Sequence, residues 1–304
     1  MSIYEHVLFS PVRNFEILFD IAESGNIGDP AYGRYGNFVF PPLPPDRPWI
    51  FSNFVHSLDG IASFKGRHAA GGDISQLPED RWLMDFLRAH ADAVLLGINT
   101  LVEETQISAN RGPVYAIEDD ALRGLRKKLG LRTQKNIFVT GAASLNLSDY
   151  RVFDPGLVGP GLLETFIITT TTGAQRLAQT TSHPHVKIII CGKGDFVDLP
   201  QAMRILRQQY GIERLLCEGG PTLYGYMSRA SLIDEKFMTI SPLEIGLFIP
   251  PEQEPTPAER NHPPRERPTT FMAPSFIKEN APWWEWLSCR RIGDHQFHRF
   301  RRRR

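Results

Sequence analysis

Short apolar runs that alternate with helical stretches constrain the fold of this chain most strongly. Between residues 49 and 240, apolar or β-branched runs of strand length recur, and stretches of helical periodicity separate several of them. Alternating strands and helices pack as helices against a mostly parallel sheet, so the sequence predicts an α/β fold. The predicted strands are 49–55, 92–96, 136–140, 165–170, 186–191, 214–217 and 237–240, and the predicted helices are 78–90, 117–129, 199–210 and 222–230.

The two ends of the chain are predicted to be additions to this sheet. Residues 1–47 read as a peripheral arm, with a short helix within 8–22 and a Pro-rich connector at the end. Residues 48–304 form the predicted main domain, in which the Pro-, Glu- and Arg-rich segment 252–268 is expected to be a surface excursion. Antiparallel strands are expected late in the chain, at 269–277, 286–291 and 296–300.

The charge balance argues against nucleic acid or a membrane surface as the partner. Lys+Arg and Asp+Glu both number 34, so no overall field attracts a polyanion. No apolar run reaches the length of a membrane span and the first residues lack the order of a signal peptide, which predicts a cytoplasmic protein. Arg299 and 301–304 form a basic end, interpreted as a solvated tail, with a local anion contact as the alternative.

The three cysteines predict neither a disulfide framework nor a metal site. Cys191, Cys217 and Cys289 form no CxxC pair and no cluster with histidine, and two of them end apolar runs. Buried, reduced thiols are therefore expected. The tryptophans at 283, 284 and 286 are interpreted as core or subunit contacts.

A Gly-Gly-Pro turn is the strongest candidate for a ligand site. The predicted strand 214–217 is followed by Glu218, Gly219 and Gly220, and Pro221 suits the first position of a helix. Glycines let a phosphate approach the backbone closely, and the free N–H groups of a helix start hold such an anion. The turn is thus either a phosphate or diphosphate site or a tight strand-to-helix connection without a ligand.

Asp59, Thr100 and Glu218 each follow a predicted strand. Ligands of parallel sheets sit at the carboxyl ends of the strands, so these side chains are expected to converge on one cleft. Asp59 precedes a glycine in the turn Ser57-Leu58-Asp59-Gly60, so a turn-forming role through its own backbone is equally open.

Three segments together resemble a known family. They are Ser57-Leu58-Asp59-Gly60, the stretch from Leu87 to Thr100 (LRAHADAVLLGINT), and Glu218-Gly219-Gly220-Pro221-Thr222-Leu223. In this order and spacing they are similar to the pyrimidine reductase of riboflavin biosynthesis, often the C-terminal half of a bifunctional deaminase-reductase. The resemblance implies a fold like that of dihydrofolate reductase, over about residues 48–246.

The resemblance also implies the reaction and the assembly. The family uses NADPH to reduce the opened ribose of a 5-amino-6-(5-phosphoribosylamino)pyrimidine to a ribityl chain, and its members are usually homodimers. A dihydrofolate- or pterin-like substrate and an NADPH-binding protein without turnover are the alternatives. The zinc deaminase half is not expected, because no His-x-Glu followed by Pro-Cys-x-x-Cys occurs in the sequence.

Matching positions carry over the family's site residues. Catalytic roles fall on Glu218 and Asp59, and Glu218 would accept hydrogen bonds from the pyrimidine or help to deliver a proton. Substrate contacts fall on Ser57, Glu218 and Arg111, where Arg111 matches the arginine that holds the substrate phosphate, with an exposed loop arginine as the alternative. Cofactor contacts fall on Val55, Thr100, Glu104, Gly219, Gly220, Pro221, Thr222 and Leu223. No metal is implied.

Overall fold

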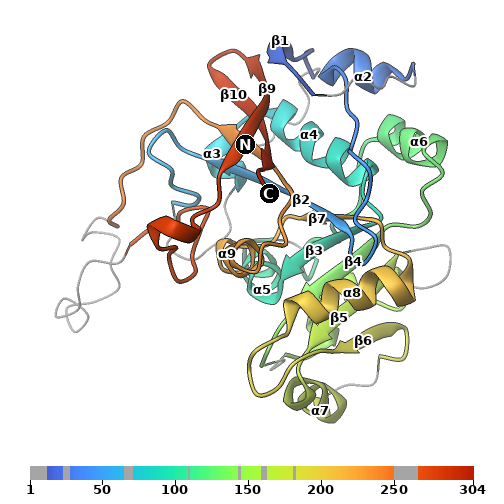
Figure 1. Ribbon diagram of the computed structural model, residues 1–304. Coiled ribbons are helices and arrows are strands. Elements are labelled where there is room, and N and C mark those ends of the chain that lie inside the picture. Colours follow the sequence, from blue (N-terminus) through green and yellow to red (C-terminus); the bar gives the residue numbers. More distant parts are fainter. Residues whose placement is uncertain are drawn as a thin grey trace.

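The seven strands predicted between residues 49 and 240 lie next to one another in one ten-stranded sheet in the computed structural model of the chain (Figure 1). The structure describes residues 12–22, 28–64, 71–108, 110–142, 145–158, 163–180, 183–249 and 266–304. From edge to edge the strands are β1 (Glu16–Asp20), β9 (Trp284–Ile292), β10 (His295–Arg302), β8 (Glu235–Ile240), β2 (Trp49–His56), β7 (Arg214–Cys217), β3 (Ala93–Gly97), β4 (Lys135–Val139), β5 (Glu164–Thr169) and β6 (Val186–Ile190). Strands β8 to β6 in this order are parallel, and β1, β9 and β10 pair antiparallel. The predicted α/β fold with antiparallel C-terminal strands is confirmed.

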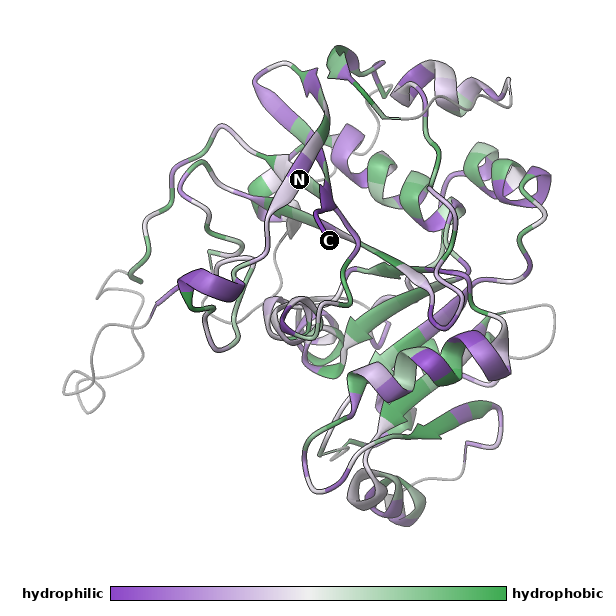
Figure 2. Ribbon diagram, viewed as in Figure 1, coloured by the Kyte–Doolittle hydropathy of each residue, from purple (hydrophilic) through white to green (hydrophobic). Residues whose placement is uncertain are grey.

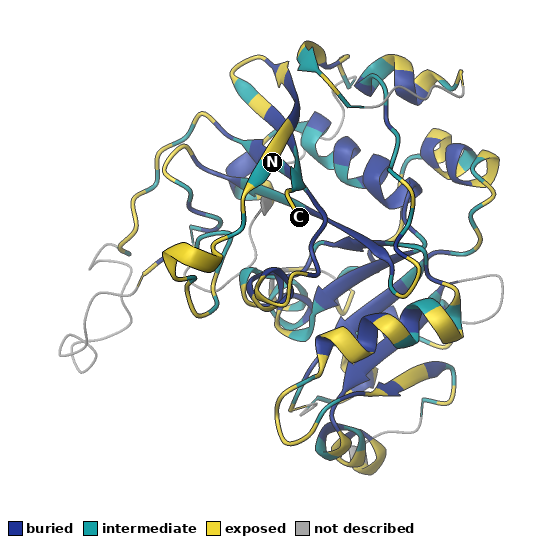
Figure 3. Ribbon diagram, viewed as in Figure 1, coloured by how far each residue is buried: buried dark blue, intermediate teal, exposed yellow. Residues whose placement is uncertain are grey.

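Helices cover both faces of the parallel part because its strands are apolar on both sides. Alternate residues of one strand enter different cores: Phe51 packs in the core under α4, and Ile50 in the core under α8. Figure 2 shows the apolar central strands, and Figure 3 shows that they are buried. The helices are α2 (Pro30–Tyr35), α3 (Gly71–Ser75), α4 (Pro78–Ala89), α5 (Ile98–Ile107), α6 (Asp120–Lys128), α7 (Thr171–Thr180), α8 (Leu199–Tyr210) and α9 (Pro221–Arg229), with 3₁₀ turns at Leu147–Asp149, Arg151–Phe153 and Lys278–Asn280.

The described part of the N-terminal arm belongs to the sheet and its core. Strand β1 pairs with β9, and the ring of Phe15 packs edge-on against Tyr35 and Phe297. The expected short helix within 8–22 is wrong where the structure describes this segment, because its apolar run pairs as an edge strand instead. Residues 8–11 lie outside the described residues.

Two of the three late strands are confirmed, and the third is wrong. β9 and β10 form an antiparallel hairpin over the predicted segments. Residues 269–277 contain only an isolated bridge between Thr269 and Ile61. Pro268 directly precedes this region and Pro274 lies within it, and neither can donate to a strand ladder, which explains the loop. Most of the predicted excursion 252–268 lies outside the described residues.

The basic C-terminal end is not a solvated tail. Arg299 is 1% exposed, and its guanidinium is paired with the fully buried carboxylate of Glu235 at 2.8 Å. Arg301 binds the other oxygen of Glu235 at 2.9 Å, and Arg304 binds Asp234 at 2.9 Å. Strand pairing explains this, since β10 lies beside β8 with Arg301 opposite Glu235. Buried charges are retained when they are paired in this way.

The expectation of reduced, buried cysteines is confirmed, because Cys191, Cys217 and Cys289 are all buried and free. Within the part of the chain that the structure describes, no helix is both long and apolar enough to span a bilayer. No group of metal-binding side chains was found among those same residues.

Candidate functional site

A cavity of about 1680 Å³ opens at the carboxyl ends of the parallel strands. Its walls are the last residues of β2, β3 and β4, the segment after β7, and the first turns of α4, α5 and α9. This is the position at which ligands enter α/β sheets. The cavity brings together Val55, Thr100, Glu104, Glu218, Gly220, Pro221, Thr222 and Leu223, which are most of the predicted site residues.

The two glycines of the Gly219–Leu223 turn have little room for a side chain. A Cβ atom on Gly219 would lie 2.9 Å from the backbone nitrogen of Gly97 and 2.9 Å from Cα of Leu96, so the turn packs directly on the end of β3. Gly220 is the N-cap of α9 and has a φ of 43°, in the region that favours glycine. Pro221 occupies the first turn, as predicted. Helix α9 thus begins at the cavity wall without a side-chain cap for its first N–H groups.

A second helix begins beside this turn. Helix α5 has Gly97 as its N-cap and lacks a side-chain cap hydrogen bond, like α9. Thr100, in the first turn of α5, is 7% exposed, and a Cβ atom on Gly220 would lie 2.9 Å from its hydroxyl oxygen. Two helix N-termini thus meet at one point of the cavity. Each end carries a partial positive charge and unpaired N–H donors, an arrangement that fits the diphosphate of a dinucleotide.

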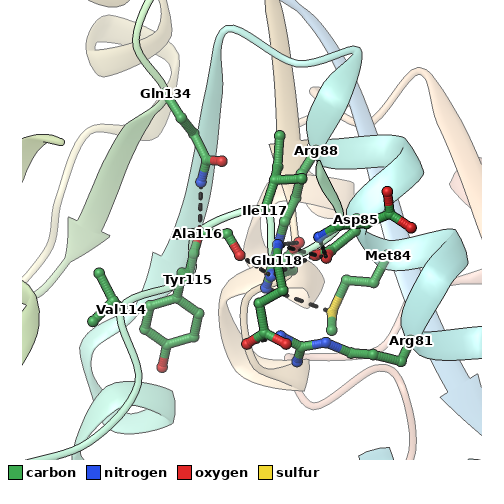
Figure 4. Close-up of polar contacts among 12 residues, drawn as sticks. Arg81, Met84, Asp85, Arg88, Val114, Tyr115, Ala116, Ile117, Glu118 and Gln134 are labelled. Atoms are coloured by element: carbon green, nitrogen blue, oxygen red, sulfur yellow. Dashed lines mark hydrogen bonds and ion pairs between the residues drawn. The ribbon is translucent and has the colours of Figure 1, made fainter. Parts of the chain in front are cut away.

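Glu218 is held by a buried arginine. Arg88, at the end of α4, donates from Nε to Oε1 and from Nη2 to Oε2, both at 2.7 Å. The two side chains are 2% and 6% exposed. The same guanidinium donates to Asp85 and to the carbonyl of Ala116, as Figure 4 shows. Burial lowers the pKa of Arg88, but the carboxylates of Glu218 and Asp85 raise it by more, so Arg88 stays charged.

This pairing limits what Glu218 can do chemically. A carboxylate has about four lone-pair positions, and Arg88 uses two of them. Glu218 therefore retains acceptor capacity for amino groups of a ligand. Protonating Glu218 would leave the charge of Arg88 partly uncompensated in a buried site, which is costly. The geometry favours the hydrogen-bond acceptor role over the proton-delivery role.

Glu104, on α5, lines the cavity. The Tyr115 hydroxyl donates to its Oε2 at 2.6 Å. Burial raises the pKa of Glu104, the Tyr115 hydrogen bond lowers it, and the nearby Glu218 raises it, with a net increase. A carboxyl group that accepts a proton readily is compatible with an anionic cofactor nearby.

Ser57 and Asp59 do not line the cavity. The Ser57 hydroxyl donates to the Asp59 carboxylate and accepts from the Ile61 amide at 2.9 Å. The other contacts of Asp59 are the amides of Ile245 and Gly246, at 3.2 and 2.6 Å. Slight burial raises the pKa of Asp59, but these hydrogen bonds lower it by more. These contacts fasten the turn internally through Ser57 and tie it to residues 245 and 246, a structural role that extends beyond its own backbone.

Arg111 does not line the cavity either. Its guanidinium donates to the carbonyl of Ser148 at 2.9 Å and to Asp154 at 2.6 Å, and its side chain is 50% exposed. Its φ of 63° belongs to a turn, which directs the side chain toward the 3₁₀ segment at 147–149. The contacts match the loop-arginine alternative for this residue.

Sequence reasoning missed several polar residues of the cavity, and three of them stand out. Asn53 on β2 has a buried Oδ1 without a hydrogen-bond partner among the described residues. Asp80, in the first turn of α4, accepts from the Thr239 hydroxyl at 2.6 Å. Arg81 is 41% exposed and pairs with Glu118 at 2.8 Å. Asn53 could have been found from the sequence, because it is a polar residue in an otherwise apolar strand. Asp80 could not, because an acidic residue in the first turn of a helix is ordinarily explained by the helix dipole.

The chain belongs to the RibD C-terminal domain family, whose model matches residues 48–258. A 2,5-diamino-6-ribosylamino-4(3H)-pyrimidinone 5′-phosphate reductase of Archaeoglobus fulgidus is 26% identical over 77% of this chain and 90% of its own length. The reductase of the same name from Methanothermobacter thermautotrophicus is 28% identical over 66% of this chain and 80% of its own length. A solved pyrimidine reductase-like protein of Corynebacterium diphtheriae has the same fold, with a TM-score of 0.60 at 20% identity over 85% of this chain and 93% of its own. The predicted family is confirmed.

Proposed function

We propose that this chain is an NADPH-dependent reductase of riboflavin biosynthesis that converts the ribosyl group of a phosphorylated aminopyrimidine into a ribityl chain. The observation that carries the proposal is the meeting of the α5 and α9 N-termini in one cavity, where Gly219 has no room for a Cβ atom. The family match and the names of the two archaeal relatives support this reaction. When bound, NADPH supplies a hydride to the carbon that is reduced.

The strand order suggests how the cofactor extends from the two helix starts. Strand β2 lies on one side of β7 and β3, and β4 lies on the other. We expect the nicotinamide beside Val55 at the end of β2, and the adenosine beyond β4, near Thr140. The exposed Arg151 lines that end and is a suitable partner for the 2′-phosphate of NADPH. Lys193, in the loop after β6, is a second basic residue that could take this role, but it does not line the cavity.

The opposite end of the cavity would take the substrate. The unpartnered Oδ1 of Asn53 and the remaining lone pairs of Glu218 are acceptors for the amino groups of a diaminopyrimidine. Arg81 replaces Arg111 as the candidate for the substrate phosphate, because Arg81 lines the cavity and is only partly committed to Glu118.

The proposal includes a cytoplasmic homodimer. Reduced cysteines are usual in the cytoplasm. Large apolar side chains are exposed along β1 and β9, including Ile17 at 50% and Trp286 at 46%. Light scattering of the purified protein tests the dimer, and Trp286→Glu is expected to weaken it if this edge forms the contact.

NADPH oxidation followed at 340 nm tests the proposed activity. The substrates are 2,5-diamino-6-ribosylamino-4(3H)-pyrimidinone 5′-phosphate, the corresponding 5-amino-6-(5-phosphoribosylamino)uracil, and dihydrofolate. Turnover of at least one phosphorylated pyrimidine, with a ribityl product identified by mass spectrometry, is expected. Turnover of dihydrofolate alone would transfer the assignment to a pterin reductase. NADPH binding without turnover of any substrate would contradict the proposed reaction.

A further inference from the structure

Asp80 is a carboxyl group of the cavity that the predicted site did not include. It lies in the first turn of α4, and its Oδ1 accepts a hydrogen bond from the Thr239 hydroxyl at 2.6 Å. Thr239 on β8 is fully buried and is the register partner of Val55 on β2. Paired strands lie about 4.8 Å apart, so Asp80 sits close to the end of the cavity proposed for the nicotinamide.

The groups around Asp80 leave it without a counter-ion. No ion pair to Asp80 is found among the described residues. Its neighbour Arg81 pairs with Glu118, and His295 at the start of β10 has its Nε2 2.9 Å from the carbonyl of Ser75 on α3. Burial raises the pKa of Asp80. The Thr239 and Ser75 hydroxyls and the charges of His295 and Arg81 lower it, but by less, so the pKa is raised overall.

Other candidate acids are engaged elsewhere. Glu218 is bound by both arms of Arg88, and Glu104 accepts from Tyr115. Asp59 is outside the cavity and is bound by two backbone amides. Asp73 on α3 is the comparable carboxyl, since burial also raises its pKa, but no hydrogen bond orients its carboxylate among the described residues. Asp80 and Glu104 both combine a fixed orientation, access to the cavity and the absence of a paired cation among the residues described. Asp80 differs because it is held by Thr239, the register partner of Val55 at the proposed nicotinamide end.

We propose that Asp80 is the general acid that protonates the substrate nitrogen during reduction. This inference rests on the proposed function, in which the opened ribosylamine presents a C1′=N bond. The hydride from the nicotinamide donor forms the new C1′–H bond, and the π pair of the C=N bond moves to nitrogen. The carboxyl O–H bond of Asp80 breaks, and its proton forms the N–H bond. C1′ is reduced, the nicotinamide is oxidised, and solvent in the cavity returns a proton to Asp80.

The first test compares Asp80→Asn with the wild-type protein in the 340 nm assay. The amide oxygen keeps the acceptor for Thr239 but has no acidic proton. General acid catalysis contributes about 10²–10⁴-fold, so kcat is expected to fall by about 10²-fold or more, while the Kd for NADPH changes little. Asp80→Glu is expected to restore part of kcat, and circular dichroism checks that both variants fold.

The pH profile distinguishes an acid from a merely structural residue. Because the acid must be protonated, wild-type kcat is expected to fall as pH rises through the elevated pKa of Asp80. This descending limb of the pH profile should be absent from Asp80→Asn. If Asp80→Asn keeps the wild-type kcat and limb while the wild type turns over, the inference is overturned and the proposed function stands. Loss of the limb in Asp73→Asn alone would likewise overturn it by assigning the acid to α3.

A spectroscopic readout does not depend on turnover. The infrared difference spectrum between wild type and Asp80→Asn is expected to show a protonated carboxyl band for Asp80 well above pH 4, about the usual value for aspartate. An ionised carboxylate throughout that range would overturn the inference. Absence of turnover in the wild type would instead refute the proposed function and, with it, the role assigned to Asp80.

Discussion

The two ends of the cavity differ in whether backbone or side-chain groups form them. The cofactor end consists mainly of backbone, with two helix N-termini, Gly97 and the Gly219–Leu223 turn packed against each other. The substrate end consists of side chains from distant parts of the chain, such as Arg88 against Glu218 and Asp80 against Thr239. A site formed by backbone groups depends on close packing and therefore tolerates few side chains at its glycine positions. A site formed by side chains depends on the ion-pair and hydrogen-bond partners that orient them. Substitutions should therefore damage the two ends through different physical effects.

Arg88→Met should have the largest effect on stability. The substitution leaves the buried carboxylates of Glu218 and Asp85 without their cation. Breaking a buried pair costs about 3–5 kcal/mol, measured as the free energy of unfolding in urea. Arg81→Met on the same helix is the matched control, because its pair with Glu118 is exposed and contributes at most about 1 kcal/mol. Equal losses of unfolding free energy in the two variants would show that the buried pair contributes no more than the exposed one.

Gly219→Ala should act on the cofactor end. Its Cβ atom would lie 2.9 Å from backbone atoms of the β3–α5 connection, which must shift. Overpacking of this kind costs about 1–3 kcal/mol, equivalent to a roughly 10–100-fold higher Kd for NADPH if the shift is removed on binding. Gly124→Ala is the control, because Gly124 lies in α6 with open space around its Cα. Unchanged NADPH affinity in Gly219→Ala would contradict the proposal that backbone groups of this turn bind the cofactor.

Glu104→Gln should change the pH dependence of stability. The folded-state pKa of Glu104 is raised, chiefly by burial, so the unfolded chain loses this proton first as pH rises. The two proteins are expected to have the same pH trend below the unfolded value, about 4.3. Above it, the wild type should lose stability relative to the variant until the folded pKa is passed. Thermal unfolding from pH 3 upward measures this, and parallel curves would show that Glu104 is not perturbed.

Arg111→Ala should have the smallest effect. Its ion pair with Asp154 is largely exposed, so stability is expected to change by less than about 1 kcal/mol. The KM for the phosphorylated pyrimidine is expected to stay near the wild-type value. Arg81→Ala, in contrast, should raise that KM because Arg81 lines the cavity. A large KM increase in Arg111→Ala alone would restore the original prediction for the phosphate.

The sequence predicted those features that are encoded locally. The Gly219–Leu223 turn depends on consecutive residues, and the strand β7 before it has the predicted bounds, Arg214–Cys217. The carboxyl ends of parallel strands also had to meet, which brought Thr100 and Glu218 together.

The remaining features depend on pairing between distant residues. Arg299 resembled part of a solvated tail because its partner Glu235 lies far away in the sequence. Asp80 resembled an ordinary acid at a helix start, because its partner Thr239 lies far away in the sequence, on β8 opposite Val55. The family resemblance assigned Arg111 to the substrate phosphate, with an exposed loop arginine as the alternative, and its turn directs it toward Asp154.

A crystal structure of the protein with NADP⁺ would test the central claim most directly. The account predicts diphosphate oxygens that accept hydrogen bonds from first-turn N–H groups of both α5 and α9, with the nicotinamide toward Val55 and Asp80. A diphosphate bound elsewhere in the cavity, without contact to either helix start, would contradict it.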